Sequence, residues 1–261
     1  MVIADEFVYV HMPKTGGTFV EEVLRRVLGR PPGWNSDVGA DQHQPVSAIP
    51  HGHRHKPVLF TVRNPYDHYV SFYCFGWWRD HAGDTFDEQR IRARYPHFPE
   101  LDFGEYLEAA LDWDLLTEPY RRVREPFEAA GLGPLTLDYV RYLSTDPDRA
   151  VANLSDLLAR QTMCAGDVAL HVVPMEQLNR DLHAFLIELG YDAADVDFVP
   201  TLEPIFPPQS TPRRDASVRW EDWYTDDLLA MVAERERLVF STWPMYDPQP
   251  CWTKQDISVA C

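Results

Sequence analysis

The chain has 261 residues, of which 45% are hydrophobic and 13% aromatic, enough to bury the core of one large α/β domain. Its 24 Lys and Arg residues against 41 Asp and Glu give a net charge of −17, which disfavours nucleic acid and any other partner bound through many phosphates. The sequence has no apolar run long enough to cross a membrane, and Asp5 and Glu6 stand where a secretory signal would need positive charge, so we expect a cytoplasmic protein without a membrane partner.

The first part of the chain alternates between strand and helix patterns. Residues 6–12 form a short apolar run that predicts a buried strand, and residues 18–29 carry apolar side chains at helical spacing. Residues 30–55 are rich in Pro, Gly, Asp and His, which indicates an irregular connection. A second apolar run at 57–62 predicts another strand, and an Asn-Pro cap starts an aromatic helix over 64–78.

The rest of the chain continues the alternation. One further strand is predicted at 168–173, and helices are predicted at 102–111, 148–163, 176–190 and 226–243. This order predicts an α/β, P-loop-like three-layer fold, with a mostly parallel central sheet flanked by helices. We expect one domain over 1–247 and a peripheral tail over 248–261. Two stretches break the pattern and are candidate lids over a site: residues 81–100 and 200–214.

The segment between the first strand and its helix reads Pro13-Lys14-Thr15-Gly16-Gly17-Thr18. In a strand, loop and helix unit, the loop N–H groups and the helix N-terminus converge on one point and form an anion site. The two glycines let the backbone approach a ligand, the lysine brings a charge, and the threonines add hydroxyl donors. In a Walker A loop the lysine follows the second glycine, whereas here it precedes the pair.

A second anion-binding group is predicted where the strand 57–62 ends. Arg63 follows this strand directly, and Ser71 lies two turns into the next helix. Both residues can therefore face the crevice beyond the strand ends, where α/β folds bind ligands. A forked guanidinium together with a hydroxyl suits a phosphate monoester.

The two segments resemble the cofactor motifs of sulfotransferases that use 3′-phosphoadenosine 5′-phosphosulfate (PAPS), particularly carbohydrate O-sulfotransferases and small bacterial relatives. The loop resembles their 5′-phosphosulfate loop, and the arginine with its serine resembles their 3′-phosphate motif. The segment 210–214 resembles their C-terminal loop. The resemblance implies transfer of a sulfuryl group to an acceptor hydroxyl, with adenosine 3′,5′-bisphosphate (PAP) as product. It assigns cofactor binding to Lys14, Thr15, Gly16, Gly17, Thr18, Phe19, Arg63, Ser71, Ser210, Arg213 and Arg214.

Sulfuryl transfer requires a base for the acceptor hydroxyl and a cation at the departing oxygen. Lys14 is the natural cation, so a metal is not required and none is expected. Histidine suits the base because its ordinary pKa lies near neutrality. The candidates precede the arginine strand: His43, His51, His53 and His55.

The length of the strand separates these candidates. His53 and His55 abut the N-terminal end of the strand 57–62. Arg63 marks the C-terminal end of this strand, about 20 Å away. His43 has enough loop behind it to stand near the crevice, and the segment 41–50 resembles the part of related sulfotransferases that carries their histidine base. We therefore predict His43 as the base, with His51 and His53 as the alternatives.

Other interpretations stay open. The runner-up is a P-loop nucleotide kinase or phosphotransferase, and a third is a non-catalytic nucleotide-binding module. The negative net charge favours a neutral or cationic small molecule or sugar as acceptor over a sulfated polysaccharide. Trp77 and Trp78 could wall such an acceptor, although aromatic residues on a helix are more often core. The scattered cysteines fit neither a zinc site nor a disulfide framework: Cys74, Cys164, Cys251 and Cys261.

Overall fold

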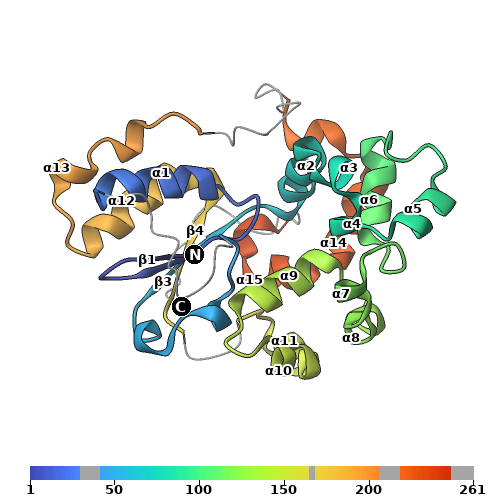
Figure 1. The fold of residues 1–261 in the computed structure, drawn as a ribbon, viewed down its shortest axis with the longest axis horizontal. Coiled ribbons are helices and arrows are strands. Elements are labelled where there is room, and N and C mark those ends of the chain that lie inside the picture. The colour runs from blue at the N-terminus through green and yellow to red at the C-terminus, as the bar shows by residue number, and fades with distance from the viewer. Residues whose placement is uncertain (30–41, 165–167, 206–217, 248–261) are drawn as a thin grey trace.

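The computed structural model describes residues 1–29, 42–164, 168–205 and 218–247 (Figure 1). Its strands form one sheet in the order β1 (Val2–Ile3), β2 (Val8–Val10), β3 (Val58–Val62) and β4 (Leu170–Pro174). The last three run parallel, and β1 is antiparallel to β2 at the edge. A mixed α/β architecture with a mostly parallel sheet is therefore confirmed, and each of the three predicted strands is present.

The register of the parallel strands brings their carboxyl ends to one edge of the sheet. Val10 pairs with Phe60, and Phe60 pairs with Val172. The loop after β2, Arg63 after β3 and the segment after β4 therefore start from the same edge. This is the edge at which ligands bind in open α/β sheets.

Helices account for most of the remaining described chain. Two of them, α1 (Gly17–Val27) and α12 (Leu178–Glu188), directly follow β2 and β4 through short connections. The others are α2 (Pro65–Phe75), α3 (Trp77–Asp80), α4 (Ala82–Thr85), α5 (Glu88–Arg94), α6 (Phe103–Leu111), α7 (Glu118–Arg121), α8 (Arg124–Ala129), α9 (Pro134–Leu143), α10 (Pro147–Ala152), α11 (Leu154–Arg160), α13 (Ala193–Val196), α14 (Asp226–Arg235) and α15 (Arg237–Thr242).

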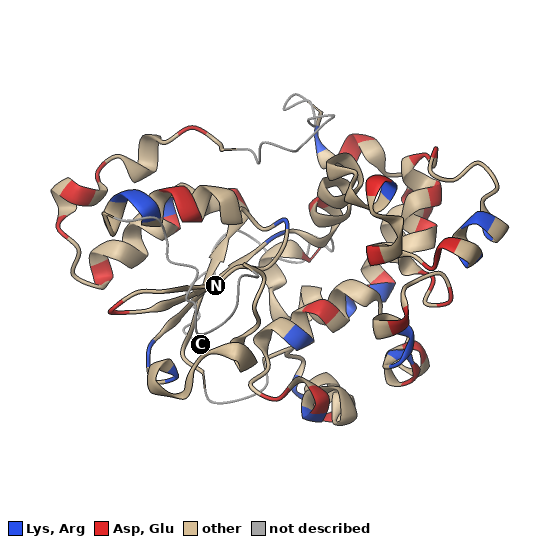
Figure 2. Cartoon of the chain, in the orientation of Figure 1, with Lys and Arg blue, Asp and Glu red and all other residues tan. Residues whose placement is uncertain are grey.

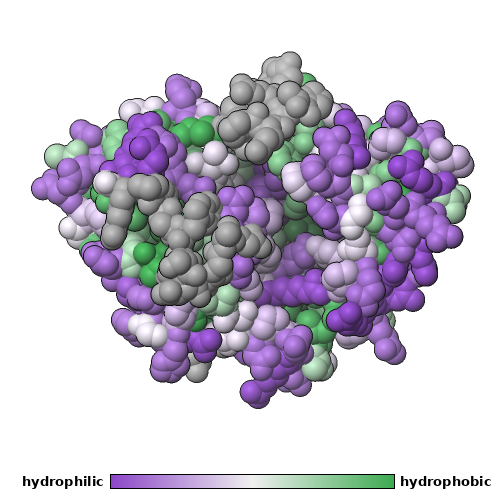
Figure 3. Space-filling model, in the orientation of Figure 1, coloured by the Kyte–Doolittle hydropathy of each residue, from purple (hydrophilic) through white to green (hydrophobic). Residues whose placement is uncertain are grey.

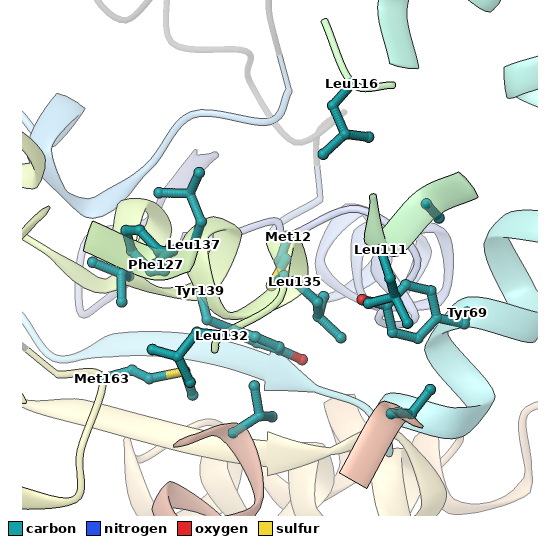
Figure 4. Close-up of a cluster of buried hydrophobic side chains, with 14 of the residues drawn as sticks. Met12, Tyr69, Leu111, Leu116, Phe127, Leu132, Leu135, Leu137, Tyr139 and Met163 are labelled. Carbon is teal, nitrogen blue, oxygen red and sulfur yellow. The ribbon is translucent and has the colours of Figure 1, made fainter. Parts of the chain in front are cut away.

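Helices cover both faces of the sheet. Alternate side chains of each strand point to opposite faces, so β2 sends Val8 and Val10 into one core and Tyr9 into the other. The first core is shared with α2, α6, α9 and α15, and the second with α1 and α12. Figure 4 shows part of the first core, with Met12 and Tyr139 among its members.

The prediction of an irregular lid at residues 81–100 is wrong. This stretch contains α4 and α5, and the Asp87 side chain caps α5 by accepting a hydrogen bond from the Arg90 N–H at 3.1 Å. Phe86 and Ile91 are fully buried in the first core. Burial of these apolar side chains fixes the segment to the body of the protein.

Two predicted helices are each divided in two. Residues 148–163 form α10 and α11, which meet at Asn153, and residues 226–243 form α14 and α15, which meet at Glu236. The aromatic helix likewise ends at Gly76, which has a φ of 72°. In addition, α7, α8 and α9 lie in residues 112–147, where the sequence predicts no regular element.

Glu236 explains the second break. It is fully buried, and its carboxylate accepts hydrogen bonds from the Thr136 N–H at 2.8 Å, the Thr136 hydroxyl at 2.6 Å and the Tyr69 hydroxyl at 2.6 Å. The carboxylate therefore caps the N-terminus of α9 and joins α2, α9 and α15. The sequence pattern alone carries no sign of this role, because the donors lie far from Glu236 along the chain.

Within the described ranges, no helix is both long enough and apolar enough to cross a membrane. Acidic residues are spread over the helices, and fewer basic residues stand among them (Figure 2). The molecular surface is hollowed near the centre of the view in Figure 3, between the side formed by α1 and α12 and the side formed by α2 to α6.

Candidate active site

The turn between β2 and α1 presents a cluster of backbone N–H groups. Lys14 and Gly16 both have positive φ, at 65° and 92°. Within the described structure, the N–H groups of residues 14–18 donate no hydrogen bond, whereas those of Phe19 and Val20 both donate to the Gly16 carbonyl. The first turn of α1 carries no acidic residue and no side-chain cap. The turn therefore offers unsatisfied donors to an anion at the positive end of a helix.

Packing requires glycine at position 17, and the positive φ of 92° favours glycine at position 16. A Cβ on Gly17 would lie 1.7 Å from His11 Nε2, and a Cβ on Gly16 would lie 2.7 Å from Leu178 Cδ2. His11 is only 6% exposed, and its Nδ1 lies 2.8 Å from Glu21 Oε1, which orients the ring. The glycines thus let the turn close against its neighbours as well as against a ligand.

Thr15 holds the turn from inside. Its hydroxyl donates to the Met12 carbonyl at 2.8 Å and lies 2.8 Å from the Thr61 hydroxyl, which must therefore donate to it. Contrary to the expectation of a hydroxyl donor for a ligand, the Thr15 proton is used within the turn, and the side chain is fully buried. Only the backbone N–H of Thr15 remains for a ligand. Thr18 is half-buried in the first turn of α1.

Lys14 brings its ammonium group to the rim of this turn. Its Nζ lies 3.6 Å from the centroid of the Phe75 ring, at the end of α2. Burial, and after it the neighbouring charge of Arg63, lowers the pKa of Lys14 to about 8. The lysine is therefore still cationic at neutral pH, and its charge is poorly solvated before any anion arrives.

Arg63 connects the end of β3 to the turn. Its NH1 donates to the Lys14 carbonyl at 2.9 Å, and its Nε and NH2 lie 2.7 and 2.6 Å from Asp67 Oδ2. The residue is 7% exposed. Ser71 lies one turn beyond Asp67 on the same face of α2, and it is half-buried. The structure thus brings Lys14 and Arg63 together, with an acidic partner that the sequence analysis does not identify.

His43 lies at the same edge of the sheet. Its Nδ1 is 3.1 Å from the His11 carbonyl, its ring centroid is 4.5 Å from that of His11, and its own carbonyl accepts a hydrogen bond from the Tyr142 hydroxyl at 3.0 Å. A carbonyl only accepts, so Nδ1 carries the proton and Nε2 of the neutral ring carries the lone pair. Gln42 Nε2 lies 3.0 Å from His43 Nε2 and donates to it. The ring is therefore oriented as a base that acts through Nε2.

His51 and His53 lie elsewhere. Both belong to a single 3-10 turn, His51–His53, which precedes the amino end of β3 and hence the end opposite to Arg63. His51 is exposed, and the Nδ1 of His53 is buried without a hydrogen-bond partner among the described atoms. Neither imidazole contacts the turn after β2 in the described structure.

Three further residues shape the site without having been singled out from the sequence. His11 tethers His43 and packs against Gly17, as described above. His68 is fully buried and donates from Nε2 to the Pro13 carbonyl at 3.0 Å, and burial lowers its pKa to about 3 so that it stays neutral. Glu176, just after β4, accepts hydrogen bonds from the Asn64 N–H at 3.1 Å and the Tyr246 hydroxyl at 2.8 Å. Only His11 had a signal in the sequence, its place between strand and loop.

Some predicted cofactor residues are not part of this constellation. Phe19 is 5% exposed in the core shared with α12, and its N–H is already bonded to the Gly16 carbonyl, so it presents no donor to a ligand. Ser210, Arg213 and Arg214 lie outside the described residues, as do the tail 248–261 and most of the second candidate lid at 200–214. The described start of that lid forms a short 3-10 turn, Val199–Thr201.

No model of a known protein family matches this chain, and no curated protein matches it. In the described parts of the chain, no group of three or more His, Cys, Asp or Glu side chains is placed to hold a metal ion. The assignment of a function therefore rests on the geometry of the turn after β2 and on the motifs that form it.

Proposed function

We propose that the protein is a PAPS-dependent sulfotransferase with a P-loop-like three-layer fold, and that it transfers the sulfuryl group to an acceptor hydroxyl. The convergence of three groups at one sheet edge supports this function most strongly. These groups are the N–H donors of residues 14–18, which have no acceptor among the described residues, the Lys14 ammonium with Arg63 bonded to its carbonyl, and the Nε2 lone pair of His43. They correspond to an anion cradle, a cation for a leaving oxygen and a base.

In the proposed reaction, the acceptor oxygen attacks sulfur while His43 Nε2 takes the hydroxyl proton. A bond forms between sulfur and the acceptor oxygen, and the bond between sulfur and the bridging phosphate oxygen breaks, so that PAP leaves with the negative charge. Lys14 stabilises that developing charge, because a cation in a poorly solvated site interacts strongly with it. Gln42 must release Nε2 before the acceptor binds.

Arg63 has a double part in this proposal. Its guanidinium orders the turn through the Lys14 carbonyl, and it carries a charge that Asp67 neutralises in the described structure. A 3′-phosphate near Ser71 would compete with Asp67 for the remaining guanidinium surface. We therefore expect Ser71, rather than Arg63, to give the cleaner measure of 3′-phosphate binding, since its replacement leaves the turn intact.

The acceptor is proposed to be a neutral or cationic small molecule or carbohydrate. The net charge of −17 repels a polyanionic chain over long range, whereas it does not oppose a single small hydroxyl compound. A sulfated polysaccharide is the class of acceptor that this charge disfavours most.

Calorimetric binding of nucleotides tests the proposal. PAP should bind without magnesium, and Ser71→Ala should weaken PAP much more than adenosine 5′-phosphate, because only PAP carries the 3′-phosphate. Ser155→Ala, an exposed serine on α11, is the matched control and should change neither affinity. Binding of ATP with magnesium, in the absence of PAP binding, would instead identify a kinase or phosphotransferase.

Catalysis needs a separate measurement. Incubation with PAPS and a panel of hydroxyl compounds should yield a product whose mass has increased by one sulfate. Tight PAP binding without any such product across the panel would favour a non-catalytic nucleotide-binding module.

A further inference from the structure

Two adjacent tryptophans at the start of α3 have opposite environments. Trp78 is 2% exposed and donates from Nε1 to the Tyr73 carbonyl, so it belongs to the core. Trp77 is 42% exposed. Among the described residues, the other large apolar side chains with comparable exposure are Ile187 and Met245. Trp77 is thus the exposed aromatic side chain that the proposed function leaves unexplained.

Trp77 is exposed but held in place. Its Nε1 donates to Asp84 Oδ2 at 2.9 Å, and its ring stacks on His81 with centroids 3.6 Å apart and an interplanar angle of 8°. Its ring is also parallel to that of Phe75, with centroids 6.3 Å apart and an angle of 8°. A fixed indole binds a ring at a smaller loss of conformational entropy than a freely rotating one.

Phe75 connects this surface to the proposed transfer site. The same phenyl ring whose centroid lies 3.6 Å from Lys14 Nζ lies parallel to Trp77. A ligand resting on the two aromatic side chains would therefore lie beside the cation assigned to the leaving oxygen. We call the pair Phe75 and Trp77 the aromatic platform.

We propose that the aromatic platform binds the ring of the acceptor, so that the acceptor is a hydroxyl compound with a flat apolar ring face, either a phenol or a pyranose. This inference rests on the proposed function, because it takes Lys14 as the position of the transferred group. The exposed Asp84 carboxylate, which accepts the Trp77 hydrogen bond, lies beside the platform and disfavours an anionic ring. We expect the stacking to change affinity three- to tenfold, which corresponds to about 0.7–1.4 kcal/mol and is typical of aromatic pairs.

Saturation-transfer NMR on the PAP-saturated protein tests the platform directly. The probes are p-cresol, methyl β-glucopyranoside and the acyclic 1,4-butanediol. We expect ring protons of p-cresol or of the glucoside to receive saturation, and the diol to receive none. Trp77→Ala should lower the affinity for that ring three- to tenfold, and Trp77→Phe should recover part of it. Ile187→Ala, an exposed apolar residue on α12, is the matched control and should change nothing.

The outcomes separate the platform from the proposed function. The platform is refuted if neither ring receives saturation, if Trp77→Ala leaves the ring affinity unchanged, or if the diol binds as well as the rings. It is also refuted if Trp77→Ala abolishes saturation of the PAP adenine protons, because the indole then holds the nucleobase. Absence of PAP binding in the wild-type protein would contradict the proposed function. The binding of the ring probes would then be measured on the protein without PAP, so that the platform is still tested.

Discussion

Replacement of Gly17 by alanine tests the packing of the anion-binding turn without any assumption about its ligand. The new Cβ would lie 1.7 Å from Nε2 and 2.1 Å from Cδ2 of His11, far inside the roughly 3.4 Å of an ordinary contact. His11 cannot simply rotate away, since it is buried and paired with Glu21. Either the ring or the start of α1 must move.

The expected cost follows from this geometry. Overpacking of a close-packed site costs about 1–3 kcal/mol, and the loss of the pair between His11 and Glu21 adds to it. A gain of up to about 1 kcal/mol from removing a helical glycine opposes this cost. We therefore expect Gly17→Ala to destabilise the protein by about 1–3 kcal/mol. In the double variant His11→Ala/Gly17→Ala the ring is absent, so the new Cβ meets no clash. The loss of stability in the double variant should therefore be about 1–3 kcal/mol smaller than the sum of the losses in the two single variants.

Urea unfolding, followed by tryptophan fluorescence, measures each free energy of unfolding, provided that the m-value stays constant. Gly52→Ala is the matched control, because a Cβ there meets no atom within 4 Å. It should be neutral or slightly stabilising. Additivity of the two single substitutions within about 0.5 kcal/mol would show that the ring does not oppose the Cβ, and would refute the packing argument.

Three further predictions concern titratable groups. Because the pKa of Lys14 is about 8, PAP affinity measured by calorimetry should be about tenfold weaker at pH 9 than at pH 7. In Lys14→Ala the affinity should hardly change over this pH range. An equal pH dependence in the wild type and the variant would refute the role of the Lys14 charge. His43→Ala should lower turnover about 10²- to 10⁴-fold with the acceptor that the mass-gain assay identifies, and it should leave PAP affinity unchanged. His55→Ala, at an exposed histidine, is the control. Full activity of His43→Ala would exclude His43 as the base. Burial raises the pKa of Asp138 from 3.8 to about 7, so wild-type stability should fall by about 3 kcal/mol between pH 4 and pH 7 relative to Asp138→Asn; parallel stability curves would contradict this.

Local sequence predicted the turn after β2, because an apolar run, a Lys-Thr-Gly-Gly segment and a helical pattern are contiguous. The placement of His43 at the same sheet edge also agrees with the loop length available to it. The sequence could not predict that Arg63 bonds the Lys14 carbonyl or that His11 lies against Gly17. Those contacts depend on how β2, β3 and α1 pack against one another, and such contacts between elements produce no periodic pattern in the sequence.

The fold was predictable where one pattern was dominant. The strands β2 and β3 are short, largely apolar runs and are buried throughout, as expected for strands of a parallel sheet that is covered on both faces. The edge strand β4 is only partly buried. The prediction failed at residues 81–100, where α5 has an Asp87 cap but only one fully buried side chain, Ile91, on a short helix. It also failed at Glu236, where a buried carboxylate interrupts a helical pattern in order to cap α9.

The pairing of the strands has a consequence for how the protein is made. The central strand β3 pairs on one side with β2, near the start of the chain, and on the other with β4, which follows α2 to α11 in sequence. Contacts between such distant segments raise the contact order and slow folding. During synthesis, β3 keeps an open hydrogen-bonding edge until residues 170–174 have left the ribosome. The edge that carries Arg63 is therefore completed late, and a truncated chain that ends before β4 would contain the residues of the anion-binding turn without the last strand of the sheet.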